Sequence, residues 1–209
     1  MSHRVNPKSF RLRELSDWLS RGFYGQHPAA FLEEDYKIRE FLEKKLKGSD
    51  IEKIEIERFP ANVNVIIYTA RPGLIIGRRG EKVTVLKDEL QKFVSRGEVK
   101  IEIKPIKNPW SSAAICGQWI ASRIEKRMAF RKIMKQALSK IMANREVEGA
   151  RVQVAGRLNG SLIARREWLK QGKLKRQTIR ADLDYAHVEA HCPYGIIGIK
   201  VWIYKGEKV

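Results

Sequence analysis

The sequence predicts an α+β protein with two consecutive domains. Segments with a helical apolar period alternate with segments in which every second residue is apolar, so neither an all-helical nor an all-strand fold accounts for the chain. Residues 104–109 contain two prolines and no clear period, which is typical of a domain boundary. We therefore expect a basic arm at residues 1–16, a first domain at 17–107 and a second at 108–209.

The N-terminal 32 residues show no regular period. Residues 1–16 are basic and short of large apolar side chains, so we expect an extended arm that becomes ordered only on a partner. Residues 17–32 are rich in aromatic side chains but are interrupted by glycine and proline, which predicts a packed loop.

The first domain begins with a helix at residues 33–47, which has acidic residues in its first turn, lysines in its last turn and Gly48 as its stop. A strand follows from Ile51, and its partner runs over 63–70. Two helical stretches then flank a glycine loop, and a third strand spans 99–103. The predicted order is helix, strand, strand, helix, loop, helix, strand.

The glycine loop reads Gly77-Arg78-Arg79-Gly80, and it is the first candidate binding site. Two glycines three residues apart allow a tight turn and close approach of a phosphodiester to backbone amides. Arg78 and Arg79 are cationic, and Arg71 and Lys82 flank the loop. A GxxG pattern alone is weak evidence, because it also occurs as a plain junction between helices.

The context of the loop is more specific than the pattern itself. A strand, the residues IIGRRG and an amphipathic helix resemble the KH module, which clamps about four nucleotides of single-stranded RNA. The predicted element order is that of the type II KH fold. We expect the apolar residues on both sides of the loop to pack two short helices against the sheet: Leu74, Ile75, Ile76, Val83, Val85, Leu86 and Leu90.

The second domain is predicted to place two helices on a mainly antiparallel four-stranded sheet. The first helix covers 111–128, and a phase shift near Arg127 separates it from a second helix that begins at Phe130. The strands are predicted at 150–154, 162–168, 178–185 and 196–204, although 162–168 also fits a short helix.

The positive charge is concentrated in one region. The net charge is +18, and residues 121–180 alone hold 17 Lys and Arg against 4 Asp and Glu. This concentration indicates a dense polyanion as partner, although charge by itself does not separate RNA from DNA or an anionic membrane. The predicted basic ridge consists of four cations, Arg127 just before the second helix and Arg131, Lys132 and Lys135 on it. No acidic residue lies between Glu125 and Glu146, so we expect the ridge to lack local counterions and to contact phosphates.

Enzyme and metal functions are disfavoured. The two cysteines do not form a disulfide framework, and no segment resembles a secretory signal or reaches membrane-spanning length. His187, His191 and Cys192 have the spacing of metal ligands but lack a fourth one nearby. Asp182, Asp184 and Glu189 could serve a nuclease metal, but Arg180 on the strand face of the two aspartates is a natural structural partner for them. We expect no metal, no cofactor and no catalytic residue.

Four segments extend the resemblance to nearly the whole chain. The segments YTARPGLIIGRRG, VAGRLNGSLIARREW, TIRADLDYAHVEAH and YGIIGIKVWIYKGE resemble, in the same order, the ribosomal protein S three family of bacterial small subunits. The resemblance implies a type II KH domain, a C-terminal α+β domain and a non-catalytic, rRNA-binding role in the head of the small subunit. It implies a cytoplasmic ribosome, with a bacterial-type organellar ribosome left open.

The resemblance also implies a location beside messenger RNA. Members of this family line the mRNA entrance channel with proteins S four and S five, touch S ten and S fourteen, and help to unwind structured mRNA. By match, the unwinding residues here are Arg131, Lys132 and Lys135, and Lys132 stands where the family usually has arginine. Nucleotide hydrolysis is not implied, and no GxxxxGK[ST] motif occurs.

Further cations of the arm and the second domain are the candidate rRNA contacts. They are Arg4, Lys8, Arg11, Arg157, Arg165, Arg166, Lys173, Lys175 and Arg176. An alternative of a different class stays open, namely a free-standing KH RNA chaperone or a metal-dependent nuclease.

Overall fold

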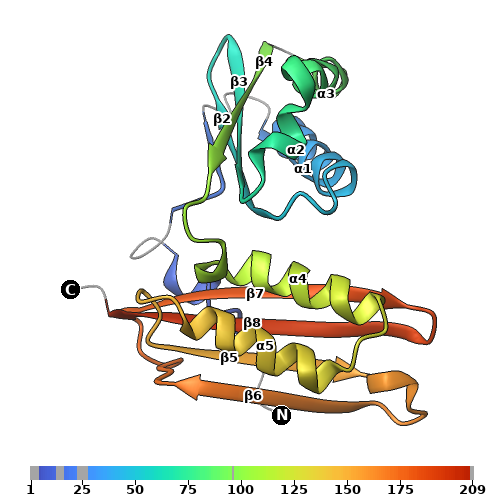
Figure 1. Ribbon diagram of the computed structural model, residues 1–209. Helices are drawn as coiled ribbons and strands as arrows, with labels where there is room; N and C mark the ends of the chain where they lie inside the picture. Colours follow the sequence, from blue (N-terminus) through green and yellow to red (C-terminus); the bar gives the residue numbers. More distant parts are fainter. Residues whose placement is uncertain (1–4, 13–16, 23–27, 96, 208–209) are drawn as a thin grey trace. The chain divides into compact units, whose positions relative to one another are not determined.

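The computed structural model describes residues 5–12, 17–22, 28–95 and 97–207 (Figure 1). The chain divides into two compact units. One is Trp18–Lys107, and the other combines the described part of Met1–Asp17 with Asn108–Val209. Each unit has its own hydrophobic core.

Three helices cover one face of a four-stranded sheet in the unit Trp18–Lys107 (Figure 1). The sheet order is β1-β2-β3-β4, with β2 and β3 antiparallel and the two outer pairs parallel. This arrangement confirms the predicted order of elements and the KH-type fold. The elements are β1 (Ser20–Gly22), α1 (Pro28–Lys45), β2 (Ile51–Arg58), β3 (Asn62–Thr69), α2 (Pro72–Ile76), a 3-10 turn (Arg78–Gly80), α3 (Glu81–Gln91) and β4 (Glu98–Pro105).

The centre of this core is formed by every second side chain of β3. Val63, Val65 and Ile67 point to the helices and are almost fully buried, and Ile38 and Leu42 of α1 pack against them with no exposed surface. Burial of such a side chain contributes about 1.5–3 kcal/mol relative to exposure, so this layer holds α1 on the sheet.

The strand β1 corrects the prediction of a packed loop at residues 17–32. Ser20, Arg21 and Gly22 pair in parallel with the end of β2, and α1 begins at Pro28 rather than at residue 33. A Cβ at Gly22 would lie 2.6 Å from Cβ of Arg58, so only glycine allows the two strands to approach at this point. Glycine has a low strand propensity, so the sequence of these three residues does not indicate a strand.

A buried ion cluster joins α1 to the end of β2. The guanidinium of Arg58 donates from Nε to Oδ1 of Asp35 at 2.7 Å and from Nη1 to Oε2 of Glu34 at 3.0 Å. Oε1 of Glu34 accepts a 2.6 Å hydrogen bond from the hydroxyl of Ser95. Arg58 also lies over the ring of Phe31, 5.1 Å from its centre.

The second unit places α4 and α5 on the same face of a sheet with order β6-β5-β8-β7 (Figure 1). All of its strand pairs are antiparallel, as the prediction of a mainly antiparallel sheet requires. The helices and strands are α4 (Ala113–Glu125), α5 (Phe130–Met142), β5 (Gly149–Gly156), β6 (Arg165–Gly172), β7 (Ala181–Cys192) and β8 (Gly195–Glu207), and 3-10 turns lie at Ser9–Arg11, Pro109–Ser111 and Leu158–Gly160.

Two strand predictions in this unit need correction. The segment 162–168 is strand only from Arg165 onward, and the strand predicted at 178–185 begins at Ala181 and continues to Cys192. A tight hairpin at Pro193 and Tyr194 allows β7 to pair with β8 over its full length. The predicted interruption between the two helices is confirmed, because Arg127 lies in the left-handed region with φ of 60°.

Arg11 corrects the prediction of an arm that becomes ordered only on a partner. Its side chain is buried, and it donates to three backbone carbonyls of the second unit: Ala181 at 3.0 Å, Arg176 at 2.9 Å and Thr178 at 2.8 Å. An arginine with several carbonyl acceptors replaces its lost water contacts. The segment around Arg11 therefore packs on the second unit without any binding partner.

Candidate nucleic-acid interface

The glycine loop has the backbone conformation that its sequence predicts. The φ angles of Gly77, Arg79 and Gly80 are 72°, 53° and 82°. A Cβ at Gly77 would lie 2.7 Å from Cγ of Lys82, whereas the space around the corresponding position of Gly80 is open. Gly77 therefore allows the loop to close over α3, and Gly80 leaves room for a ligand backbone to approach.

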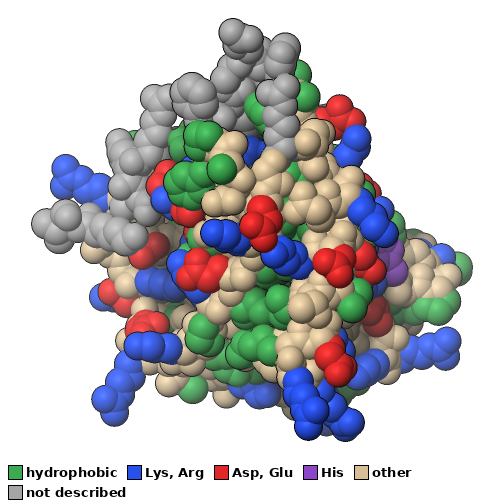
Figure 2. All heavy atoms as spheres, turned by 90° about the horizontal axis from the view of Figure 1, so that it is seen from above, with side chains coloured by type: hydrophobic (Ala, Val, Ile, Leu, Met, Phe, Trp, Pro, Cys, Tyr) green, Lys and Arg blue, Asp and Glu red, His purple; other side chains and the backbone are tan. Residues whose placement is uncertain are grey.

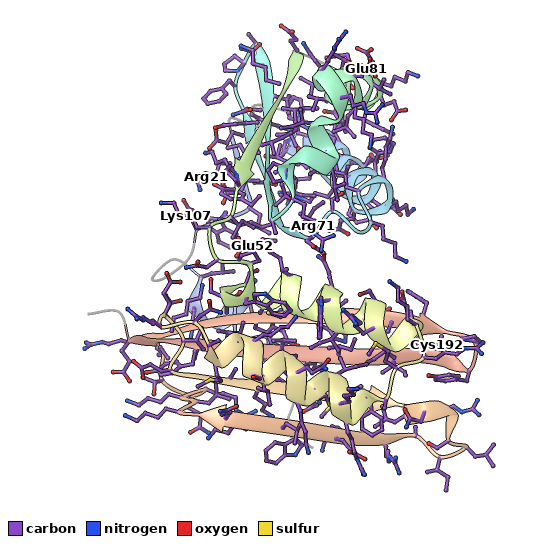
Figure 3. All side chains as sticks on the ribbon, in the orientation of Figure 1. Arg21, Glu52, Arg71, Glu81, Lys107 and Cys192 are labelled. Carbon is purple, nitrogen blue, oxygen red and sulfur yellow. The ribbon has the colours of Figure 1, made fainter. Side chains whose placement is uncertain are left out.

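Both loop arginines lie at the protein surface. Arg78 and Arg79 are exposed, and Figure 3 labels the residues that bracket this stretch, Arg71 before α2 and Glu81 at the start of α3. The loop therefore presents two cations at the start of α3, where the helix dipole also favours an anion.

Only some of the apolar residues that flank the loop pack against the sheet. Ile75, Leu86 and Leu90 are buried and anchor α2 and α3 on the sheet. Leu74, Ile76 and Val85 remain 49%, 40% and 52% exposed, so the prediction that all seven apolar residues pack against the sheet is wrong for these three. Leu74 and Val85 instead line a groove of about 610 Å³ with Lys82 and residues 45–49.

Arg71 and Lys82 are partly engaged within the protein. Nε of Arg71 lies 2.8 Å from Oδ2 of Asp50, and Nζ of Lys82 lies 3.5 Å from the carbonyl oxygen of Leu74. The side chain of Arg71 is still 59% exposed. The exposed ion pair of Arg71 contributes about 0–1 kcal/mol, and the contact of Lys82 is at the long limit of a hydrogen bond, so a phosphate can compete for both cations.

The basic ridge on α5 is exposed, as its sequence period predicts. Phe130, Ile133, Met134, Ala137, Leu138 and Ile141 are buried against the sheet. Arg131, Lys132 and Lys135 are exposed on the other side of the helix. Figure 2 shows the molecule from above the view of Figure 1, and on that face Lys and Arg side chains are interspersed with Asp and Glu.

Glu167 of β6 corrects the prediction that the ridge lacks counterions. Its carboxylate accepts two hydrogen bonds from Arg131, from Nε at 3.0 Å and from Nη2 at 3.1 Å. Nε of Arg165 lies 3.3 Å from the same carboxylate. The hydrogen bond from Arg131 lowers the pKa of Glu167, and the same bond raises the pKa of Arg131. The sequence prediction considered only neighbours along the chain and missed this partner.

Arg127 is exposed in the turn between α4 and α5. Its amide donates to the carbonyl of Ile124 at 2.8 Å, which fixes the turn. Arg127 lines a cavity of about 270 Å³ together with Met128, Ala129, Asn159 and Tyr194. Arg127, the fourth predicted ridge residue, therefore lies in the turn before α5, whereas Arg131, Lys132 and Lys135 lie on the helix itself.

The candidate rRNA contacts fall into three groups. Arg11 is buried, which contradicts its assignment as a surface contact, and Arg4 lies outside the described residues. Three others form ion pairs within the protein: Lys8 with Asp184 at 3.1 Å, Arg165 with Glu167, and Lys175 with Glu207 at 2.6 Å. A fourth, Arg157, donates to the backbone carbonyls of Ser161 at 2.9 Å and Tyr194 at 3.2 Å. Arg166, Lys173 and Arg176 are exposed.

The acidic residues considered as nuclease ligands have structural contacts. Asp184 accepts a 2.6 Å hydrogen bond from the amide of Ala113 at the first turn of α4 and pairs with Lys8. Lys8 and this amide, not the expected Arg180, are therefore the partners recorded for Asp184. Among the described residues, no group of three or more His, Cys, Asp or Glu is arranged to hold a metal ion. No helix in the described ranges is long and apolar enough to cross a membrane.

The face of the second sheet opposite the helices carries aromatic and basic residues that are not among the predicted site residues. The guanidinium of Arg151 lies 4.3 Å from the ring centre of Trp168 and 5.4 Å from that of Trp202. Trp168 is 51% exposed. The signal was present in the alternation of these residues with core residues along β5, β6 and β8.

Comparison with known families agrees with both units. Residues 37–111 match the family described as "KH domain", and residues 120–203 match the family described as "Ribosomal protein S3, C-terminal domain". Together with the glycine loop and the basic helix, these matches define the class as a ribosomal protein with a KH RNA-binding domain.

Relatives extend the similarity to the whole chain. It is 45% identical over 208 residues to "Small ribosomal subunit protein uS3" of Caldicellulosiruptor saccharolyticus, covering 99% of this chain and 93% of that one. The protein of the same name from Oleidesulfovibrio alaskensis is 44% identical, covering 99% and 96%, and "Small ribosomal subunit protein uS3c" of Guillardia theta is 41% identical, covering 100% and 97%. The chain belongs to the uS3 family of small-subunit ribosomal proteins, which confirms the resemblance drawn from the four segments.

Proposed function

We propose that this chain binds small-subunit rRNA and lines the mRNA entrance channel in the head of the subunit, where it helps to open structured mRNA. The main support for this proposal is the exposed ridge of Arg131, Lys132 and Lys135 on a helix whose other face is buried. The chain that carries this ridge is a member of the uS3 family. Arg131 and Lys132 lie in the first turn of α5 and Lys135 lies in the next, so the three cations can hold neighbouring phosphates of a single strand.

The two units have different roles in this proposal. The glycine loop with Arg78 and Arg79 grips an RNA backbone, and the exposed Arg166, Lys173 and Arg176 of the second unit contact rRNA phosphates. The ridge binds the incoming message. Holding single-stranded phosphates favours the opened form of a hairpin by mass action, so the step requires no nucleotide hydrolysis. Ribosomal proteins S four, S five, S ten and S fourteen are the proposed protein neighbours.

Sucrose-gradient fractionation of a lysate in high salt tests the ribosomal assignment. We expect the chain in stoichiometric amount in the small-subunit and whole-ribosome peaks. A chain that stays at the top of the gradient would contradict this assignment and favour a free-standing RNA chaperone or nuclease, which an RNA annealing and cleavage assay would then separate.

The variant with Arg131→Ala, Lys132→Ala and Lys135→Ala tests the role of the ridge. We expect translation of a message with a 5′-proximal hairpin to fall several-fold, with a much smaller effect on an unstructured message, because the lost contacts matter most where a duplex must open. The measurement is translation in a reconstituted system with ribosomes that carry the variant.

A charge-matched control separates the ridge from the overall positive field. Arg145→Ala, Lys170→Ala and Arg180→Ala remove the same charge from exposed positions of the same unit outside the ridge. This control should translate both messages alike. An equal loss on both messages for the ridge variant would reject a role in unwinding.

A further inference from the structure

Glu167 accepts both hydrogen bonds from one edge of the guanidinium of Arg131. It lies opposite Val154 of the core-forming strand β5, so its side chain is on the sheet face that carries α5. Both carboxylate oxygens accept from Arg131, and Arg165 approaches one of them from two residues away on the same strand. One carboxylate therefore neutralises part of the charge of two arginines.

Arg131 holds the carboxylate of Glu167 through two N–H donors, in the same way that an arginine binds a phosphate. A guanidinium binds a carboxylate or a phosphate through the same two parallel N–H donors, and it cannot bind both at that edge at once. The side chains of Arg131, Arg165 and Glu167 are 69%, 50% and 25% exposed. Water and salt therefore weaken the ion pair, so an incoming phosphate can displace the carboxylate.

We infer that Glu167 is an internal competitor of RNA on the ridge, and that RNA binds by exchanging this carboxylate for a phosphodiester at Arg131 and Arg165. The inference rests on the proposed function and deepens it. It moves Arg165 from the rRNA contacts to the message-binding surface. It also means that Glu167 lowers the affinity of the ridge, so that a strand held there exchanges readily between neighbouring positions.

The test is Glu167→Gln in the full chain, with a fluorescein-labelled 15-nucleotide uridine RNA as the probe. Fluorescence anisotropy should show binding about 3- to 10-fold tighter in low salt. The slope of log affinity against log salt should steepen by about 0.7 for each additional phosphate contact. The amide keeps the shape of the side chain but not its charge, and Glu167→Ala is the second variant.

Two controls identify the cause of any gain. Glu189→Gln removes the same charge from an exposed position of β7 and should change the affinity much less. In a background of Arg131→Ala with Arg165→Ala, Glu167→Gln should have no further effect, because the arginines that it releases are absent.

The opposite result would assign Glu167 a positioning role. If Glu167→Gln and Glu167→Ala keep the thermal stability of the parent chain and bind the RNA equally or more weakly, the carboxylate does not compete, and the inference is overturned. The ridge variant with three alanines, measured in the same assay, tests the proposed function separately. Weaker binding by that variant would support the ridge whatever Glu167 does.

Discussion

Arg58→Met is expected to lower the free energy of unfolding of the unit Trp18–Lys107 by about 3–5 kcal/mol. The side chain of Arg58 is 4% exposed, and those of Asp35 and Glu34 are 4% and 11% exposed. Removal of the arginine leaves two buried carboxylates without the cation that balances them. Their desolvation is no longer offset, and the end of β2 loses its link to α1.

Hydrogen exchange of the full chain measures this effect locally. Amides of β2 and β3 should lose most of their protection, whereas those of β5 and β8 in the other unit should keep theirs. Lys44→Met is the matched control, because it removes a cation from the exposed pair with Glu40 and should change stability by about 0.5 kcal/mol or less.

A second variant distinguishes loss of charge balance from loss of packing. Adding Glu34→Gln and Asp35→Asn to Arg58→Met removes the unpaired charges and should recover part of the stability. If Arg58→Met were no more destabilising than Lys44→Met, the cluster would contribute little to the fold. The pairing of β1 with β2 would then depend on other contacts, such as the hydrogen bonds from Arg39 to the carbonyl of Leu19 and the hydroxyl of Ser20.

The parts of the fold that the sequence predicted are those set by local patterns. The helix α5 was predicted because its apolar residues recur with a helical period, and the glycine loop because Gly77 and Gly80 stand where positive φ is required. Both features depend on residues a few positions apart. The order of the two domains likewise followed from these local patterns and from the two prolines in residues 104–109.

The features that were missed depend on residues far apart in the chain. Arg131 and Glu167 are 36 positions apart, and nothing in the residues around α5 indicates that β6 will place a carboxylate there. Arg11 was taken for an RNA contact because its acceptors are backbone carbonyls at 176, 178 and 181, which have no signature in the sequence. A basic residue that forms part of the fold and one that faces solvent look alike in a sequence.

Arg78→Asp with Arg79→Asp should weaken binding of a single-stranded RNA to the full chain by about 10-fold or more in low salt. The exposed loop offers both guanidinium groups to a backbone that can approach closely at Gly80. Reversal of both charges removes two phosphate contacts and adds repulsion. The slope of log affinity against log salt should flatten by about 0.7 for each lost contact.

The choice of aspartate keeps the loop conformation, so the result reports on charge. Arg79 has φ of 53°, and aspartate is among the few residues that adopt the left-handed region readily. Lys92→Asp reverses one charge at the far end of α3 and should change the affinity only slightly, because that end is about 16 Å from the loop at 1.5 Å per residue. An unchanged salt slope in the double variant would mean that Arg78 and Arg79 do not contact the RNA. Binding by this chain would then depend on the cations of the second unit, where the ridge variant in the same assay would show the larger loss.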